Sequence, residues 1–147
     1  MKKHELLNFR KRSFYIDQSL VSDNILVFFQ LDDLRWFSLS ISEGSFCIKE
    51  EQYEPEYQSL SNIKDSFAYP IEDLPELDKF KQATLDEVYE YRLNNNLDFC
   101  VGMFFKLDKG DFSIIDNEGS LSIVAGVDDK LLAQCKLIHC CCNEYIK

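Results

Sequence analysis

The chain carries one phrase twice, and this repetition constrains its fold more than any other feature of the sequence. The first copy is FFQLDDLRWFSLSISEGSFCI, residues 28–48, and the second is FFKLDKGDFSIIDNEGSLSI, residues 104–123. The second copy is one residue shorter than the first between Asp108 and Phe112. Aligned with a gap there, the copies share ten identities: Phe28/Phe104, Phe29/Phe105, Leu31/Leu107, Asp32/Asp108, Phe37/Phe112, Ser38/Ser113, Glu43/Glu118, Gly44/Gly119, Ser45/Ser120 and Ile48/Ile123. Chance gives roughly one or two identities over such a length, so the sequence predicts a duplicated structural unit.

Apolar and polar residues alternate within each copy, and this pattern predicts strands. Phe37, Leu39 and Ile41 alternate with serines, which is the period of two of a strand with one buried face. We therefore expect each copy to be a three-stranded antiparallel meander. The expected strands are 25–31, 35–41 and 45–50 in repeat 1, about 25–50, and 99–107, 111–116 and 120–125 in repeat 2, about 99–125.

The Glu-Gly-Ser shared by the copies falls between the last two strands of each meander. Gly44 and Gly119 can adopt positive φ without a steric penalty, so these triplets predict turns. The alternative interpretation is that the paired Glu43 and Glu118 contact a partner.

Two further segments show helical spacing. Thr84-Leu85-Asp86-Glu87 matches a capping box and predicts a helix over about 84–95, which the asparagines at 94–96 would end. Near the C-terminus, Leu131, Cys135, Ile138 and Cys142 form one apolar stripe on a helix over about 128–142. A strand over 137–142 remains an alternative there.

These elements predict one α+β domain over residues 1–147, with the two meanders related by an approximate two-fold and covered by one or two helices. A content of 46% hydrophobic residues is enough to fill a core in a chain of 147 residues. We expect the meanders to share a core made of Phe28, Phe29, Phe37, Leu39, Ile41, Phe46, Ile48, Phe104, Phe105, Phe112, Ile114, Leu121 and Ile123.

The formal net charge is −10, and its distribution is uneven. Residues 50–91 hold twelve carboxylates and three lysines, a balance of −9. We expect no binding to nucleic acid, because phosphate binding needs clustered lysine and arginine. No apolar run is long enough to span a membrane and the N-terminus lacks a signal-peptide pattern, so a cytoplasmic protein is expected.

The six cysteines and two histidines give weak evidence for chemistry. The tail HCCC, residues 139–142, lacks the C-x-x-C spacing of zinc sites, and Cys135 and Cys142 fit a packed apolar stripe. We expect no metal and no cofactor, with metal binding or redox chemistry at Cys140–Cys142 as the alternatives. No nucleophile elbow, P-loop or dinucleotide-binding motif is present in the sequence, so we expect no enzymatic activity.

The acidic linker, residues 50–83, contains all three prolines and is interleaved with tyrosines, as in EEQYEPEY at 50–57. Carboxylates attract a basic partner, and tyrosines supply rigid contact area with a polar end. We therefore predict a partner-binding surface; the alternative is a solvated acidic surface. The predicted residues are Glu50, Glu51, Tyr53, Glu54, Glu56, Tyr57, Tyr69, Glu72, Asp73, Glu76 and Asp78.

As a type, this small acidic chain with the EEQYEPEY segment and no catalytic motif resembles the immunity proteins of bacterial toxin and contact-dependent growth inhibition systems. The resemblance implies stoichiometric binding to a cognate basic toxin domain, possibly a nuclease, with its substrate access blocked. The alternatives are a structural or adaptor module for protein interactions and a small enzyme or thiol-dependent protein that uses Cys140–Cys142.

Overall fold

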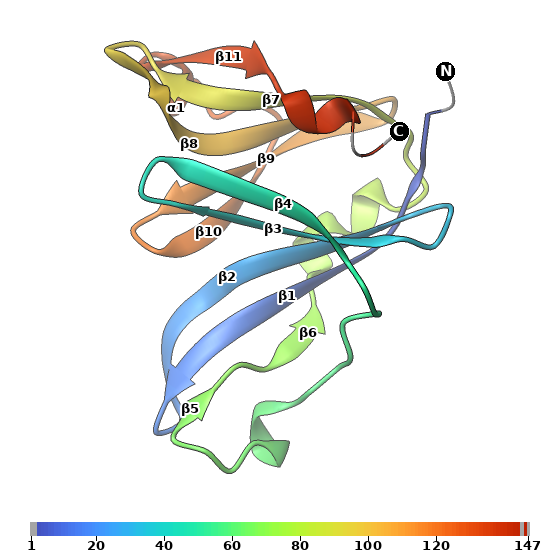
Figure 1. Ribbon diagram of the computed structural model, residues 1–147, viewed down its shortest axis with the longest axis vertical. Helices are drawn as coiled ribbons and strands as arrows, with labels where there is room; N and C mark the ends of the chain where they lie inside the picture. The colour runs from blue at the N-terminus through green and yellow to red at the C-terminus, as the bar shows by residue number, and fades with distance from the viewer. Residues whose placement is uncertain (1–2, 145, 147) are drawn as a thin grey trace.

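A computed structural model describes residues 3–144 and 146 and consists mainly of two antiparallel sheets (Figure 1). The first sheet has the order β4-β3-β2-β1-β5, with β6 also paired to β1, and the second has the order β10-β9-β8-β7-β11. In Figure 1, β1, β2 and β5 extend beyond the second sheet. The prediction of an α+β fold is wrong, because 61% of the chain is strand and only 11% is helical.

The strands and helices have the following bounds. The first sheet contains β1 (Leu6–Ile16), β2 (Ser19–Leu31), β3 (Trp36–Ser42), β4 (Ser45–Glu51), β5 (Phe67–Ala68) and β6 (Ile71–Asp73). The second contains β7 (Leu85–Leu93), β8 (Asn96–Leu107), β9 (Gly110–Asn117), β10 (Ser120–Ala125) and β11 (Cys135–His139). The helical elements are α1 (Asp129–Leu132) and the 3-10 turns η1 (Leu60–Asn62), η2 (Pro75–Phe80) and η3 (Cys141–Glu144).

The two repeated phrases fold with the same strand register. Phe29 pairs with Phe37 across β2 and β3, and the equivalent Phe105 pairs with Phe112 across β8 and β9. The last hairpin of each copy closes through two residues with positive φ, Glu43 and Gly44 at 50° and 82°, and their equivalents 118 and 119 at 53° and 89°. Two positive φ values define a type I′ turn, so the predicted glycine turns are confirmed.

Each copy also contains a first strand that the sequence did not predict. β1 pairs with β2 through Phe9 and Phe29, and β7 pairs with β8 through Val88 and Phe105. The repeated structural unit is thus a four-stranded meander, β1–β4 or β7–β10, and the phrase covers its last three strands.

The hairpin turn of each copy contacts the other copy. Gly44 O accepts a hydrogen bond from Cys100 N on β8, at 2.8 Å. Gly119 O accepts one from Ser22 Oγ on β2, at 3.1 Å, and Asn24, which aligns with Cys100, donates from Nδ2 to Leu121 O at 2.8 Å. Reciprocal contacts of this kind are what a two-fold relation between two copies produces.

The main core lies between the sheets and is built around four phenylalanine rings. The Phe29 ring lies 5.5 Å from Phe37 and 6.0 Å from Phe105, which stacks on Phe112 at 4.8 Å. Most of the predicted core residues are in this cluster. Phe28 and Phe104 are exceptions, because neighbouring residues of a strand point to opposite faces, and each lies on the outer face of its sheet.

The predicted helix at 84–95 is wrong, since these residues form β7. The pairing of β7 with β8 shifts register between Leu85 and Glu87. This bulge places Leu85 and Val88, three residues apart, in the same core, which imitates helical spacing. Thr84 N donates to Asp108 Oδ1 rather than taking part in a capping box.

The predicted helix at 128–142 is also wrong, because α1 covers only four residues before the chain enters β11. Asp128 Oδ1 accepts from Leu131 N and caps this short helix. β11 then pairs with β7 from Cys135 to His139, which satisfies the backbone groups of what would otherwise be an open edge. Among the described residues, no helix is long and apolar enough to cross a membrane.

Candidate functional site

Two arginines of β1 lie on the outer face of the first sheet, which is the face turned away from the second sheet. Because side chains alternate along a strand, Phe9 enters the main core while Arg10 and Arg12 point outward. Arg10 pairs in register with Phe28, and Arg12 pairs with Leu26 on one side and Ile71 on the other. The outer face of this sheet therefore carries cationic and aromatic side chains.

Arg10 attaches the acidic linker to this face. Its Cζ lies 4.6 Å from the centre of the Trp36 ring and 4.0 Å from that of Tyr57, so the guanidinium is held between two aromatic rings. Nη1 donates to Pro55 O and lies 3.5 Å from a carboxylate oxygen of Glu54. Only 7% of Arg10 is exposed. We call this arrangement the Arg10 clamp.

The hydroxyl group of Tyr57 is held in place as well as its ring. Its hydroxyl donates to Asp73 Oδ1 on β6, at 2.5 Å. This hydrogen bond, with a smaller contribution from burial, raises the pKa of the Tyr57 hydroxyl. The linker therefore crosses the outer face in a defined path instead of extending into solvent.

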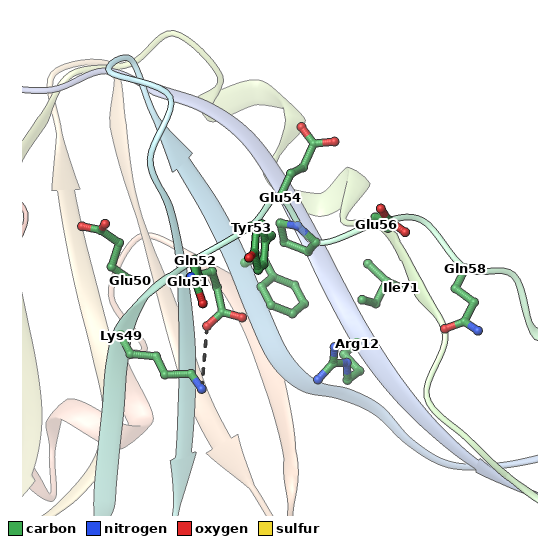
Figure 2. Close-up of a pocket in the computed structure, with 12 residues that line it drawn as sticks. Arg12, Lys49, Glu50, Glu51, Gln52, Tyr53, Glu54, Glu56, Gln58 and Ile71 are labelled. Atoms are coloured by element: carbon green, nitrogen blue, oxygen red, sulfur yellow. Dashed lines mark ion pairs between the residues drawn. The ribbon is translucent and has the colours of Figure 1, made fainter.

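An open groove of about 540 Å³ lies between the linker and the sheet. Arg12, Phe28 and Ile71 line its floor, and residues 49–56 and Gln58 form its rim. In Figure 2, Glu51 points toward Lys49, with 3.8 Å between Nζ and the carboxylate oxygen. We call this the outer groove.

Within the part of the chain that the structure describes, the Arg12 side chain has an unpaired hydrogen-bond donor in the outer groove. Its Cζ lies 5.5 Å from the centre of the Phe28 ring, and its buried Nε has no hydrogen-bond partner. Buried polar atoms are normally hydrogen-bonded, so this nitrogen is a place where water or a partner could bind. The groove thus offers a donor on its floor and carboxylates on its rim.

Exposed aromatic side chains continue the outer face beyond the groove. Phe14 on β1 stacks with Tyr69 at 4.9 Å and with Phe67 at 6.2 Å. Tyr53 at the groove rim is 77% exposed, Phe67 is 57% exposed and Tyr69 is 47% exposed. Exposed aromatic groups on a rigid sheet are typical of a protein-binding surface.

The structure brings most of the predicted site residues together and leaves three apart. The groove is lined by Glu50, Glu51, Tyr53, Glu54 and Glu56. Tyr57 and Asp73 belong to the clamp, and Tyr69 lies on the adjoining surface. Glu72 pairs with Lys11, between Arg10 and Arg12, so it points to the opposite face of the sheet. Glu76 and Asp78 lie on η2 and do not line the groove.

Sequence reasoning did not find the floor of the site. Arg10, Arg12, Phe14, Phe28, Trp36 and Phe67 were not assigned to it. The available signal was the alternation of arginines with other residues from Phe9 to Phe14, which has the period of a strand.

The six cysteines are spread over several parts of the fold. Cys100, Cys140 and Cys142 are buried in the main core and Cys135 in the outer cluster of the second sheet, whereas Cys47 and Cys141 are exposed. Burial raises the pKa of the Cys100 thiol to about 11. Packing is therefore confirmed for Cys135 and Cys142. Glu90, Cys140 and Cys141 place one ligand atom each within 4.8 Å of one another.

The chain matches no protein-family model, and no curated protein or solved structure matches it significantly.

Proposed function

We propose that this protein is a non-catalytic binding protein that engages a basic protein partner through the outer face of its first sheet. The observation that carries the proposal is the Arg10 clamp, which fixes an acidic, tyrosine-bearing linker over an open groove. A surface that is already ordered loses less conformational entropy on binding than a mobile one.

The groups on this surface have separate roles in binding. Glu56 has an exposed carboxylate at the groove rim and attracts lysine and arginine of the partner during encounter. Glu50 and Glu51 add to this attraction, although they also lie 3.5 Å from Arg35 Nη1 and 3.8 Å from Lys49 Nζ, respectively. Glu54 is already within ion-pair distance of Arg10 and contributes less to this attraction. Tyr53, Tyr69 and Phe67 supply the contact area that holds the complex once it has formed.

The biological role that we propose for this surface is that of an immunity protein. Such a protein binds a cognate basic toxin domain, including nuclease domains, with one-to-one stoichiometry and blocks access of the toxin's substrate. The support is the run of carboxylates in residues 50–57, which lies at the groove beside the exposed Tyr53 and Tyr57.

The binding surface is tested with a partner obtained by affinity capture and then purified. The triple variant Glu51→Gln, Glu54→Gln and Glu56→Gln should lower the association rate about tenfold at low salt, while Tyr53→Ala should raise the dissociation rate several-fold. The matched control removes three exposed carboxylates elsewhere, through Asp98→Asn, Glu118→Gln and Asp129→Asn. Equal slowing by both triple variants would show that only net charge matters and would overturn the assignment of the surface.

The immunity role is tested separately, on the activity of the captured partner. One equivalent of the wild-type protein should abolish that activity, and the triple variant should need a higher concentration to do so at low salt, where its missing charges are not screened. A partner that stays fully active when saturated would contradict the immunity role while leaving the binding surface intact.

A further inference from the structure

The C-terminal segment folds back over β7 and brings thiols to a buried carboxylate. Glu90 on β7 pairs in register with Ile138 on β11, and Cys140 N then donates to Val88 O at 2.9 Å. The chain turns there into η3, which begins at Cys141. The result is the group of Glu90, Cys140 and Cys141, whose ligand atoms lie within 4.8 Å of one another.

We propose that Glu90, Cys140 and Cys141 bind a thiol-preferring divalent cation, with Zn²⁺ as the chemical type. Thiolate sulfur and carboxylate oxygen are both ligands that zinc accepts, and three protein ligands leave a fourth position for water or a neighbouring side chain. We call this group the Glu90 site.

The separation of the ligand atoms suits such an ion. Zinc–sulfur bonds of about 2.3 Å in a tetrahedron place two sulfurs about 3.8 Å apart. The observed limit of 4.8 Å therefore requires the ligand atoms to close by about 1 Å at most, which side-chain rotation can supply because Cys141 is exposed.

The charges around Glu90 would balance once a divalent cation and two thiolates are present. Glu90 is only 4% exposed, and Arg92 donates to it from Nε at 2.7 Å and from Nη2, both to Oε1. A carboxylate and two thiolates balance Zn²⁺ and the Arg92 guanidinium, so the loaded site would be neutral, as buried charges require.

The backbone next to the site supports a metal-bound sulfur. Cys142 N donates to Cys140 Sγ at 3.2 Å. Hydrogen bonds to a ligand from the surrounding shell orient it and stabilise its charged form. Cys141, at the surface, gives a path for the ion to enter. The ion would fasten η3 to β7 and lies apart from the outer groove, which is on the other sheet.

The test uses the reduced, purified full chain titrated with Co²⁺, which gives thiolate charge-transfer absorption when cysteine binds it. Wild-type protein should bind one equivalent with this absorption, and Zn²⁺ should displace it. Cys141→Ser should weaken binding at least tenfold. Because Cys141 is exposed, this variant should fold normally. The matched control is Cys47→Ser, which changes the other exposed cysteine and should bind like wild type.

A thermal unfolding measurement adds a second readout. Zn²⁺ at a hundredfold excess over its wild-type dissociation constant should raise the Tm of the wild-type and Cys47→Ser proteins and raise that of Cys141→Ser clearly less. Glu90→Gln should likewise lose the Co²⁺ absorption or shift it. No thiolate absorption in the wild-type protein, or equal loss in Cys47→Ser and Cys141→Ser, would overturn the proposal. Neither result bears on partner binding at the outer groove.

Discussion

Phe28 and Phe104 occupy equivalent positions in the two copies of the meander, but their surroundings differ. Phe28 lies on the floor of the outer groove beside Arg12, with Trp36 and Ile71. Phe104 packs with Tyr91, Ile115 and Cys135, in a cluster that Leu131, Leu132 and Leu137 complete. The outer face of the first meander is thus open as a groove, whereas that of the second meander is covered by apolar side chains.

The serine shared by the copies shows how this difference arises. In the first copy, Ser38 Oγ donates to Glu51 Oε2 at 3.2 Å, which ties the serine to the groove rim. In the second, Ser113 Oγ donates to Gly126 O at 2.7 Å and lies 2.6 Å from the Tyr91 hydroxyl. The meanders are alike, so what distinguishes the two faces is the segment that covers each of them.

The largest loss of stability should come from substitutions in the core that the two meanders share. Phe37→Ala and Phe112→Ala each remove a buried ring from the main core, so each should lower the free energy of unfolding by about 3–5 kcal/mol. Urea unfolding monitored by circular dichroism measures both. Phe67→Ala, at an exposed position, is the control and should change stability little. A large loss in one copy with none in the other would contradict a core shared equally by the two meanders.

The repeated sequence allowed the last three strands of each meander to be predicted, because it contains the turn residues and the apolar–polar alternation of those strands. Gly44 and Gly119 marked the hairpins, and the alternation around Phe37 and Phe112 marked the strands. The first strand of each meander could not be read in this way. β1 has charged residues at neighbouring positions, and the bulge in β7 gave it the spacing of a helix.

The acidic half of the candidate site was predictable from composition, since carboxylates and tyrosines cluster in residues 50–57. The floor beneath it depends on long-range pairing. Arg10 meets Pro55 and Trp36 only because β1 pairs with β2 and the linker crosses back over both. The Glu90 site depends on the pairing of β11 with β7 in the same way.

The clamp should have the next largest effect, and it is specific to the open face. Arg10→Met removes two cation–π contacts and the hydrogen bond to Pro55 O, so it should lower the free energy of unfolding by about 2–4 kcal/mol. It should also free the linker backbone at the exposed Tyr53 and Tyr57 for cleavage by chymotrypsin, which limited proteolysis detects. Arg12→Met is the matched control and should leave the linker protected. Equal protection in both variants would show that Arg10 does not hold the linker.

The equivalent hairpin turns should respond unequally to the same substitution. Gly119→Ala meets no atom within 4 Å and has only the left-handed backbone penalty, about 1–2 kcal/mol. At Gly44 a Cβ would also lie 2.5 Å from the Phe99 ring, so Gly44→Ala should cost about 2–3 kcal/mol in total. Unfolding curves of the two variants give the difference. Equal losses would mean that Phe99 moves aside without penalty.

The smallest effect should be a gain in stability at the turn between the second and third strands of the first meander. Leu34 adopts a φ of 75° there and is 67% exposed, whereas the corresponding turn of the second meander has Gly110 at 118°. Leu34→Gly removes the left-handed strain but adds backbone freedom to the unfolded chain, which leaves a net stabilisation of about 0.5–1 kcal/mol. Because Leu34 is largely exposed, the change loses little packing, and the backbone bond from Leu34 N to Leu31 O is kept. A lower midpoint of urea unfolding in Leu34→Gly would show that the first meander prefers leucine at this turn, and the two turns would then differ in more than strain.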